Sequence, residues 1–192
     1  MLHKLRSGLT GLLAPLLRGD VEADETYIGG YRPGRKGRGV GKVGVAIVVE
    51  RRGRTAGSAR LAVIPRATTA VLTSFVHGAI RPQEATVHTD AWASYTELSH
   101  MGIDHRRRKG GQGRHTVDGL PWAHTVFGNL KTWLVGTFHG VSPKHLQRYL
   151  DEFVFRFDRR WKEAELFPRV LHCAIDAEPR AKTHPVFPML HP

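Results

Sequence analysis

The sequence predicts an α/β fold, in which a mixed sheet of three antiparallel strands followed by helix-linked strands is flanked by helices. Two patterns support this prediction. Near the N-terminus, three strand-like segments are joined by glycine-rich turns, as in an antiparallel meander. After them, helical periodicity alternates with short strand-like segments, giving the order β-β-β-α-β-α-β. The length of 192 residues and a hydrophobic content of 41% suit one domain with a proper core and a small appendage.

The expected elements follow from local patterns. In chain order they are a helix at 5–17, strands at about 20–28, 43–50 and 58–65, a helix at about 69–80, a strand at 85–90, a short helix at 91–100, a strand at 103–107, and helices at about 121–134, 142–157 and 163–175. Thr68-Thr69 and Ser142 are expected to cap the helices that they precede. These elements divide the chain into a helical lead-in (1–19), a main domain (20–161) and a C-terminal helix with a loose tail (162–192).

The first strand is unusual because its stretch from Val21 to Gly30 carries three carboxylates, which a buried strand normally avoids. Alternation along the strand puts Glu22, Asp24 and Thr26 on one face and Glu25 on the other. Asp24 therefore either projects into a site that holds a cation or lies at an exposed edge. Glu22 and Glu25 are expected to be edge charges or groups that support a neighbouring site.

The charge balance indicates a polyanionic partner, since the formal net charge is +12 and the pI is about 10.5. The basic residues cluster in two glycine-rich loops, where contact with backbone phosphates is expected from Arg35, Lys36, Arg38, Lys42, Arg106, Arg107, Arg108, Lys109 and Arg114. Cys173 is the one cysteine, which excludes an internal disulfide framework. No apolar run approaches the roughly 18 residues of a membrane span, so a cytoplasmic protein without a membrane partner is expected.

Four residues form a candidate constellation. Asp24 lies on the first strand and Asp90 ends the fourth, where α/β sheets commonly carry their sites. His124 follows Asp90 by 34 residues (124 − 90), and Lys131 lies seven residues further (131 − 124), on the same face of one helix. Two carboxylates and a third ligand fit a divalent-metal site for phosphoryl transfer, with Lys131 contacting the phosphate. Taken alone, His124 also fits a surface or capping histidine, Lys131 a solvated lysine, and Trp92 a packing residue behind Asp90.

Four stretches carry a family likeness: V-E-A-D-E-T-Y-I-G-G, H-T-D-A-W-A-S-Y, W-A-H-T-V-F-G-N-L-K and G-T-F-H-G-V-S-P-K-H-L-Q-R-Y-L-D-E-F-V-F-R-F-D-R-R. Together they resemble the catalytic domain of bacterial insertion-sequence DDE transposases of the fifteen-ninety-five type, over residues from about 1 to 161. The resemblance implies a ribonuclease-H-like fold. It also implies metal-dependent cleavage at transposon ends and transfer to target DNA, with two Mg²⁺ or Mn²⁺ ions and a homo-oligomer on DNA. Asp24 and Asp90 match the first two catalytic acids, His124 the third position and Lys131 the trailing lysine.

The chain departs from this family in two ways. His124 stands in place of the usual Glu, as in some members that have His or Asn there, and imidazole suits Mn²⁺ better than Mg²⁺. The zinc ribbon and helix-turn-helix that usually precede the domain are missing from the 192 residues, so a truncated or mis-started copy is expected. Two other functions stay open, a ribonuclease-H-like nuclease without strand transfer and an inactive DNA-binding remnant.

Overall fold

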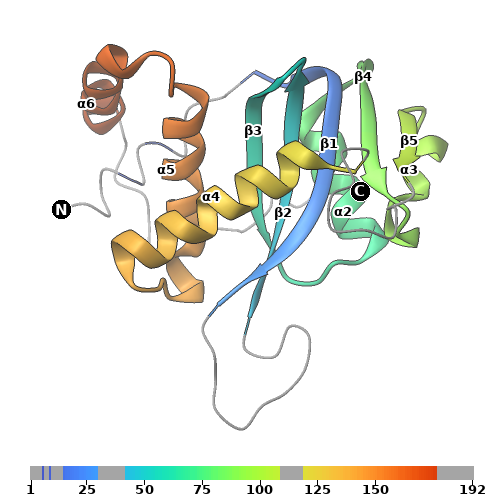
Figure 1. The fold of residues 1–192 in the computed structure, drawn as a ribbon, viewed down its shortest axis with the longest axis horizontal. Coiled ribbons are helices and arrows are strands. Elements are labelled where there is room, and N and C mark those ends of the chain that lie inside the picture. The colour runs from blue at the N-terminus through green and yellow to red at the C-terminus, as the bar shows by residue number, and fades with distance from the viewer. Residues whose placement is uncertain (1–5, 7–8, 10–14, 30–41, 109–118, 177–192) are drawn as a thin grey trace, which may run out of the picture.

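The computed structural model describes residues 6, 9, 15–29, 42–108 and 119–176. Its centre is a five-stranded sheet in the order β3-β2-β1-β4-β5 (Figure 1). The strands are β1 (Leu17–Ile28), β2 (Val43–Arg52), β3 (Thr55–Ile64), β4 (Ile80–Asp90) and β5 (Asp104–Arg108). β1, β2 and β3 pair antiparallel, whereas β4 pairs parallel with both β1 and β5. This mixed sheet confirms the predicted α/β, ribonuclease-H-like fold.

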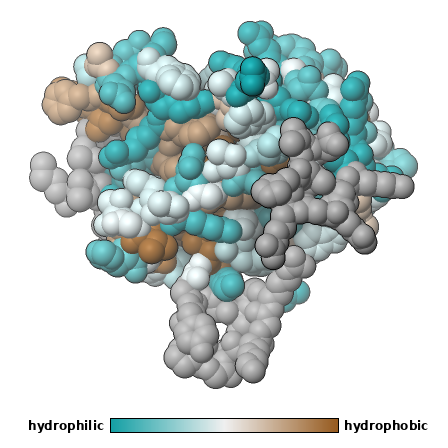
Figure 2. Space-filling model, viewed as in Figure 1, coloured by the Kyte–Doolittle hydropathy of each residue, from teal (hydrophilic) through white to brown (hydrophobic). Residues whose placement is uncertain are grey.

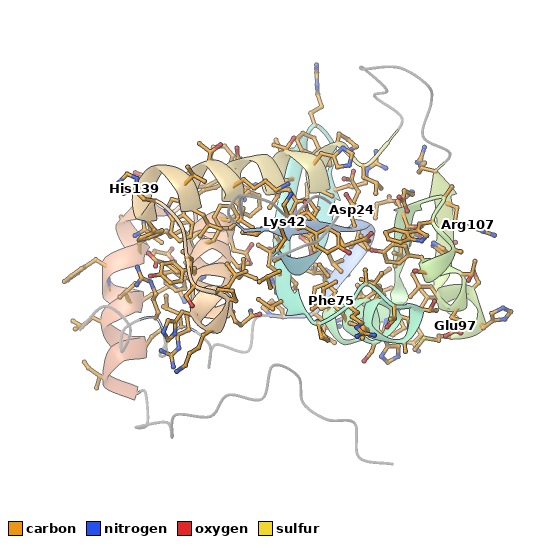
Figure 3. All side chains as sticks on the ribbon, turned by 90° about the horizontal axis from the view of Figure 1, so that it is seen from below. Asp24, Lys42, Phe75, Glu97, Arg107 and His139 are labelled. Atoms are coloured by element: carbon orange, nitrogen blue, oxygen red, sulfur yellow. The ribbon has the colours of Figure 1, made fainter. Side chains whose placement is uncertain are left out.

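Helices cover both faces of the sheet, as Figure 3 shows from the side. The helices are α2 (Thr69–Ala79), α3 (Glu97–His100), α4 (Pro121–Phe138), α5 (Leu146–Asp158) and α6 (Leu166–Asp176), with short 3-10 turns η1 (Ala93–Tyr95), η2 (Pro143–His145) and η3 (Glu163–Glu165). α2 and α3 pack on one face of the sheet, where Leu72, Val76 and Leu98 are fully or almost fully buried. α4 and α5 pack on the other, around Leu130 and Leu150. In the described part of the chain, no helix is long and apolar enough to cross a membrane.

The order of elements agrees with the prediction, but several boundaries differ. β1 begins at Leu17 rather than near residue 20, and the preceding part of the helix predicted at 5–17 lies largely outside the described residues. β4 begins at Ile80 and contains Pro82, since its pairing with β1 shifts register there and a bulge tolerates a proline. α4 runs four residues past the predicted end at Leu134, and it stops where His139 adopts a left-handed conformation (φ 53°).

The two predicted caps have different outcomes. The Thr68 side chain accepts a hydrogen bond from the Val71 N–H (3.4 Å), which confirms it as the cap of α2. Ser142 makes no capping hydrogen bond with its side chain, so that prediction was wrong. The turn η2 lies between Ser142 and α5, and the His145 N–H bonds the Ser142 main-chain carbonyl instead (2.9 Å).

The outer edge of β3, which pairs with no further strand in the described residues, is covered by side chains of α5 and of the residues after α5. Gln147 accepts from the Val63 N–H (2.8 Å) and donates to the Leu61 carbonyl, while Asp158 accepts from the Ala59 N–H (2.9 Å). Further along, Arg160 donates to the Ala56 carbonyl. These side chains bond main-chain groups that a sixth strand would otherwise pair. The motif F-R-F-D-R-R, in the block with the most specific family likeness, therefore has a structural role at this edge.

Candidate active site

Asp24 and Asp90 lie side by side on neighbouring parallel strands. The paired register of β1 with β4 ends with Glu22 opposite His88, and Asp24 and Asp90 each lie two residues beyond this last pair. Neighbouring strands are about 4.8 Å apart, and residues in register on them point to the same face. The Asp24 side chain is 13% exposed. The two carboxylates thus share the face that α4 covers, and Asp24 lies between the sheet and this helix (Figure 3).

Both carboxylates are partly satisfied by main-chain groups. Asp24 Oδ1 accepts from the Glu25 N–H (2.8 Å), and Asp90 Oδ1 accepts from the Trp92 N–H (3.0 Å). Burial is the main cause that raises the pKa of Asp24 from 3.8 to about 6, and repulsion by the charges of Asp90 and Glu22 raises it further. The hydrogen bond from the Glu25 N–H and the charge of Lys131 act in the opposite direction and lower this pKa. The site therefore concentrates negative charge that a bound cation would stabilise.

α4 brings His124 and Lys131 to β1. His124 Nε2 is 3.2 Å from Asp24 Oδ2, although the His124 side chain is 70% exposed. About two turns further along the helix, Lys131 Nζ donates to Thr26 Oγ1 (2.8 Å). Asp24 and Thr26 thus both point toward α4, which confirms the alternation predicted for this strand.

The donor set fits a divalent cation of the Mn²⁺ type, because it combines two carboxylates with one imidazole. Asp24 and His124 are already in contact, and among the described residues each aspartate has a second oxygen that accepts no main-chain N–H. Within the described residues, however, no group of three or more Asp, Glu, His or Cys side chains is gathered closely enough to hold a metal ion. A cation held by all three side chains would require Asp90 and the exposed His124 side chain to move closer to Asp24.

Glu22 and Glu25 make specific contacts that the sequence did not reveal. The Glu22 side chain is completely buried, and its Oε2 accepts from the N–H groups of Trp122 and Ala123 at the start of α4 (2.8 and 2.9 Å). On the opposite face of β1, Glu25 accepts from the Tyr95 hydroxyl (2.7 Å). Neither residue is an edge charge. The two carboxylates among buried neighbours in one strand were the only sign in the sequence that such contacts exist. The partners could not be identified, because Trp122 lies 100 residues from Glu22 and Tyr95 lies 70 residues from Glu25.

The prediction that Trp92 packs behind Asp90 is wrong, because 43% of Trp92 is exposed. The chain turns directly after β4, so that the main chain of Trp92 contacts Asp90 while its indole points outward. Tyr95 takes the buried aromatic position instead, with 1% of its surface exposed.

The basic residues of β5 flank the acidic centre. Arg108 lies opposite Asp90 in the β4–β5 register, and its Nε donates to His88 Nδ1 (3.3 Å). The other ring nitrogen of His88 therefore carries a proton and donates to Asp20. Arg107, labelled on β5 in Figure 3, is exposed and alternates with Arg108, so it belongs to the opposite face of the strand. Lys42 is exposed just before β2, Arg106 is exposed on β5, and the other predicted phosphate contacts lie outside the described residues: Arg35, Lys36, Arg38, Lys109 and Arg114.

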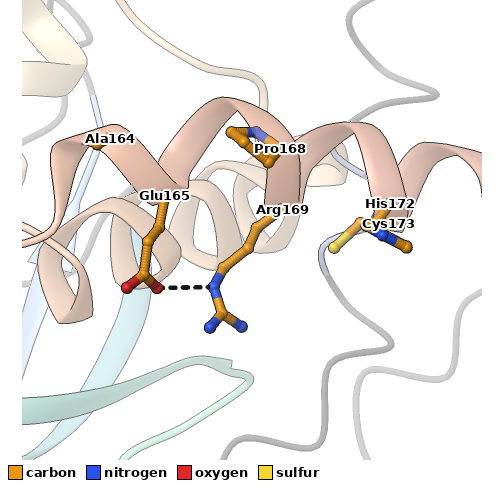
Figure 4. A pocket seen from close by; sticks show the side chains of 6 residues that line it. All are labelled: Ala164, Glu165, Pro168, Arg169, His172 and Cys173. Atoms are coloured by element: carbon orange, nitrogen blue, oxygen red, sulfur yellow. Dashed lines mark hydrogen bonds and ion pairs between the residues drawn. The ribbon is translucent and has the colours of Figure 1, made fainter.

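The surface shows the same division. In Figure 2 the side over β4 and β5 is mainly hydrophilic, whereas apolar surface gathers toward α5 and α6. A pocket on η3 and α6 is lined by Ala164, Glu165, Pro168, Arg169, His172 and Cys173 (Figure 4). Glu165 and Arg169 form an exposed ion pair across it (3.1 Å). This pocket contains none of the site residues.

Two comparisons with known proteins bear on this geometry. A family model described as an ISXO2-like transposase domain matches residues 16–158. A search of the curated proteins found no match. The matched segment contains all five strands, α4 and α5, and therefore both aspartates, His124 and Lys131.

Proposed function

Because the chain belongs to the ISXO2-like family of DDE transposases, we propose that residues 20–161 are a catalytic domain for divalent-metal-dependent cleavage and transfer of insertion-sequence DNA. The observation that carries this proposal is the convergence of Asp24, Asp90 and His124 on one face of the sheet. The parallel pairing of β1 with β4 brings the strands of Asp24 and Asp90 together, and α4 brings His124 into contact with Asp24. The partner is DNA, both as transposon end and as target, and the protein acts on it as a homo-oligomer.

The proposed metal ligands are Asp24, Asp90 and His124, holding one or two Mg²⁺ or Mn²⁺ ions. A bound divalent cation activates the attacking oxygen and stabilises the leaving oxygen in such reactions. Asp24 and Asp90 supply the negative charge that attracts the cation, and a bound cation would lower the pKa of Asp24, which burial and the charges of Asp90 and Glu22 raise. Burial of Asp24 between the sheet and α4 also keeps bulk water away from the carboxylate.

The positive side chains near this centre are suited to the DNA backbone. Lys131 can exchange its bond with Thr26 for a phosphate oxygen, since a lysine acts as a point charge toward phosphate. Arg108 is held next to Asp90 by the buried His88, so its guanidinium is oriented before DNA arrives. Arg106 and Lys42 add phosphate contacts around the site, and Arg107 adds one from the opposite face of β5.

The test is strand cleavage of the DNA that flanks the gene, carried on a supercoiled plasmid, with Mg²⁺ or Mn²⁺. Asp24→Asn and Asp90→Asn are expected to abolish cleavage while DNA binding stays close to wild type. Glu97→Gln, which removes an exposed carboxylate of α3 outside the site, is the matched control and is expected to cleave normally. Cleavage that survives both aspartate substitutions would refute the assignment.

A joining assay separates the proposed function from its two alternatives. Pre-cut ends with free 3′-hydroxyl groups are supplied together with a target plasmid. A transposase joins them, whereas a nuclease without strand transfer cleaves DNA and leaves the ends unjoined. An inactive DNA-binding remnant neither cleaves nor joins with either metal, and its binding still weakens with salt.

A further inference from the structure

Glu22 is a fully buried carboxylate that the proposed chemistry does not use. It lies two residues before Asp24 on the same face of β1. Its Oε2 accepts two main-chain hydrogen bonds from α4, at Trp122 and Ala123. Its Oε1 has no hydrogen-bond partner among the described residues, and its nearest positive charge is Arg51, whose Nε is 3.4 Å away.

α4 depends on an acceptor from outside the helix. The first N–H groups of a helix have no partner within it, and Leu120 at the N-cap offers no side-chain oxygen. The first turn of α4 contains no acidic residue, and Pro121 at its first position has no N–H. Glu22 therefore supplies the missing acceptor, and its charge stands at the positive end of the helix dipole.

This arrangement costs more than a local cap would. Burial raises the pKa of Glu22, so its charged form is disfavoured even though the N–H groups of Ala123 and Trp122 and the charge of Arg51 lower that pKa. A serine or asparagine at position 120 would offer a side-chain oxygen to the same N–H groups without a buried charge. Unlike a local cap, a cap supplied by β1 also fixes the position of the start of α4 relative to β1.

That placement determines where the third ligand lies. Glu22, Asp24 and Thr26 contact α4 at its start, at His124 and at Lys131. Four residues of strand and nine residues of helix each span about 13 Å, so the first and the last of these contacts are spaced alike on the two elements. We propose that Glu22 is a positioning residue, which fixes α4 on β1 through its reach and thereby holds His124 next to Asp24.

The test separates the reach of this side chain from its charge, and its metal arm rests on the proposed function. Glu22→Gln keeps the reach and a carbonyl acceptor but loses the charge, whereas Glu22→Asp keeps the charge and shortens the side chain by one methylene. Glu50→Asp is the matched control, because Glu50 is also buried and accepts a main-chain N–H, from Ser58 (3.2 Å) outside the site. Hydrogen exchange at the amides of Trp122 and Ala123 and affinity for Mn²⁺ alone are measured for the full chain.

Glu22→Asp is expected to speed amide exchange at Trp122 and Ala123 by about tenfold or more, as the loss of a hydrogen bond to a charged group implies. It is also expected to weaken Mn²⁺ binding as much as His124→Ala does, and the double variant should be no weaker than either single one. Glu22→Gln should keep slow exchange and most of the Mn²⁺ affinity, and Glu50→Asp should change neither.

Three outcomes would overturn the positioning role. They are unchanged exchange in Glu22→Asp, a loss of Mn²⁺ affinity in Glu22→Gln as large as in Glu22→Asp, and additive effects of Glu22→Asp and His124→Ala. The second outcome would make the charge of Glu22 itself the important feature. If Asp24→Asn leaves Mn²⁺ binding of the protein unchanged, the proposed metal site fails, while the exchange measurement still tests the contact between Glu22 and α4.

Discussion

Replacing Asp24 by Asn is expected to stabilise the metal-free protein at neutral pH. Burial and the charges of Asp90 and Glu22 raise the pKa of Asp24 from 3.8 to about 6, so the folded state resists ionisation of this carboxyl group. The difference between 6 and 3.8, at 1.36 kcal/mol per pH unit, corresponds to about 3 kcal/mol at pH 7.5. Because Asn is neutral and keeps the acceptor for the Glu25 N–H, it avoids this cost.

The pH dependence gives the sign of the effect. A raised pKa contributes stability that is fully present below pH 3.8 and is lost as the pH rises through about 6. The free energy of unfolding of Asp24→Asn, minus that of the wild type, should therefore be near zero at pH 3.5. It should grow to at most about 3 kcal/mol by pH 7.5, or roughly 6–12 °C in Tm for a domain of this size.

Urea denaturation with EDTA at several pH values is the assay. Glu97→Gln is a suitable control, because its exposed carboxylate is expected to show no such pH-dependent difference. Adding Mn²⁺ should then stabilise the wild type and leave Asp24→Asn unchanged. A stability difference that is constant between pH 3.5 and 7.5 would refute the reasoning, since it would show that ionisation of Asp24 costs the fold nothing.

Three further predictions concern the metal, the sheet edge and the DNA. His124→Glu replaces imidazole by carboxylate and should shift the cleavage preference from Mn²⁺ toward Mg²⁺; an unchanged Mg²⁺/Mn²⁺ activity ratio would argue against His124 as a ligand. Asp158→Ala leaves the Ala59 N–H of the β3 edge without its acceptor and should lower the free energy of unfolding by about 1–3 kcal/mol in urea titrations, more than Glu97→Gln does. Replacing Arg106 and Arg107 by Gln should weaken DNA binding for all sequences alike and reduce the slope of log K against log salt by about 2, and an unchanged slope would place both arginines away from phosphates.

The sequence was most informative where structure follows a strict local period. Alternation with period two predicted that Glu22, Asp24 and Thr26 share one face of β1, and all three indeed contact α4. The order of elements placed Asp90 at the end of the fourth strand, and the structure shows that this strand is parallel to β1 and next to it. The local pattern thus predicted the positions of the two aspartates, although their role as metal ligands stays a prediction.

The contacts between distant segments could not be predicted in the same way. Glu22 reaches an N-terminus 100 residues further along the chain, and no local preference identifies such a partner. The prediction for Trp92 was wrong for a different reason, because an aromatic residue beside a buried strand was expected to be buried as well. The turn after Asp90 instead uses the Trp92 N–H, and the indole remains outside. Burial after a turn depends on the direction of the chain, which composition does not encode.

The covered edge of β3 makes the two ends of the sheet unequal. Side chains of Gln147, Asp158 and Arg160 occupy its main-chain donors and acceptors, so no further strand can add there without displacing them. In the described part of the chain β5 pairs with β4 alone, and it carries three consecutive arginines. Among the described residues, β5 is therefore the edge at which a further strand can add, with β5 between that strand and Asp90. A reporter strand or fused peptide meant to augment the sheet should be designed against β5, and acidic residues in that peptide would complement its arginines.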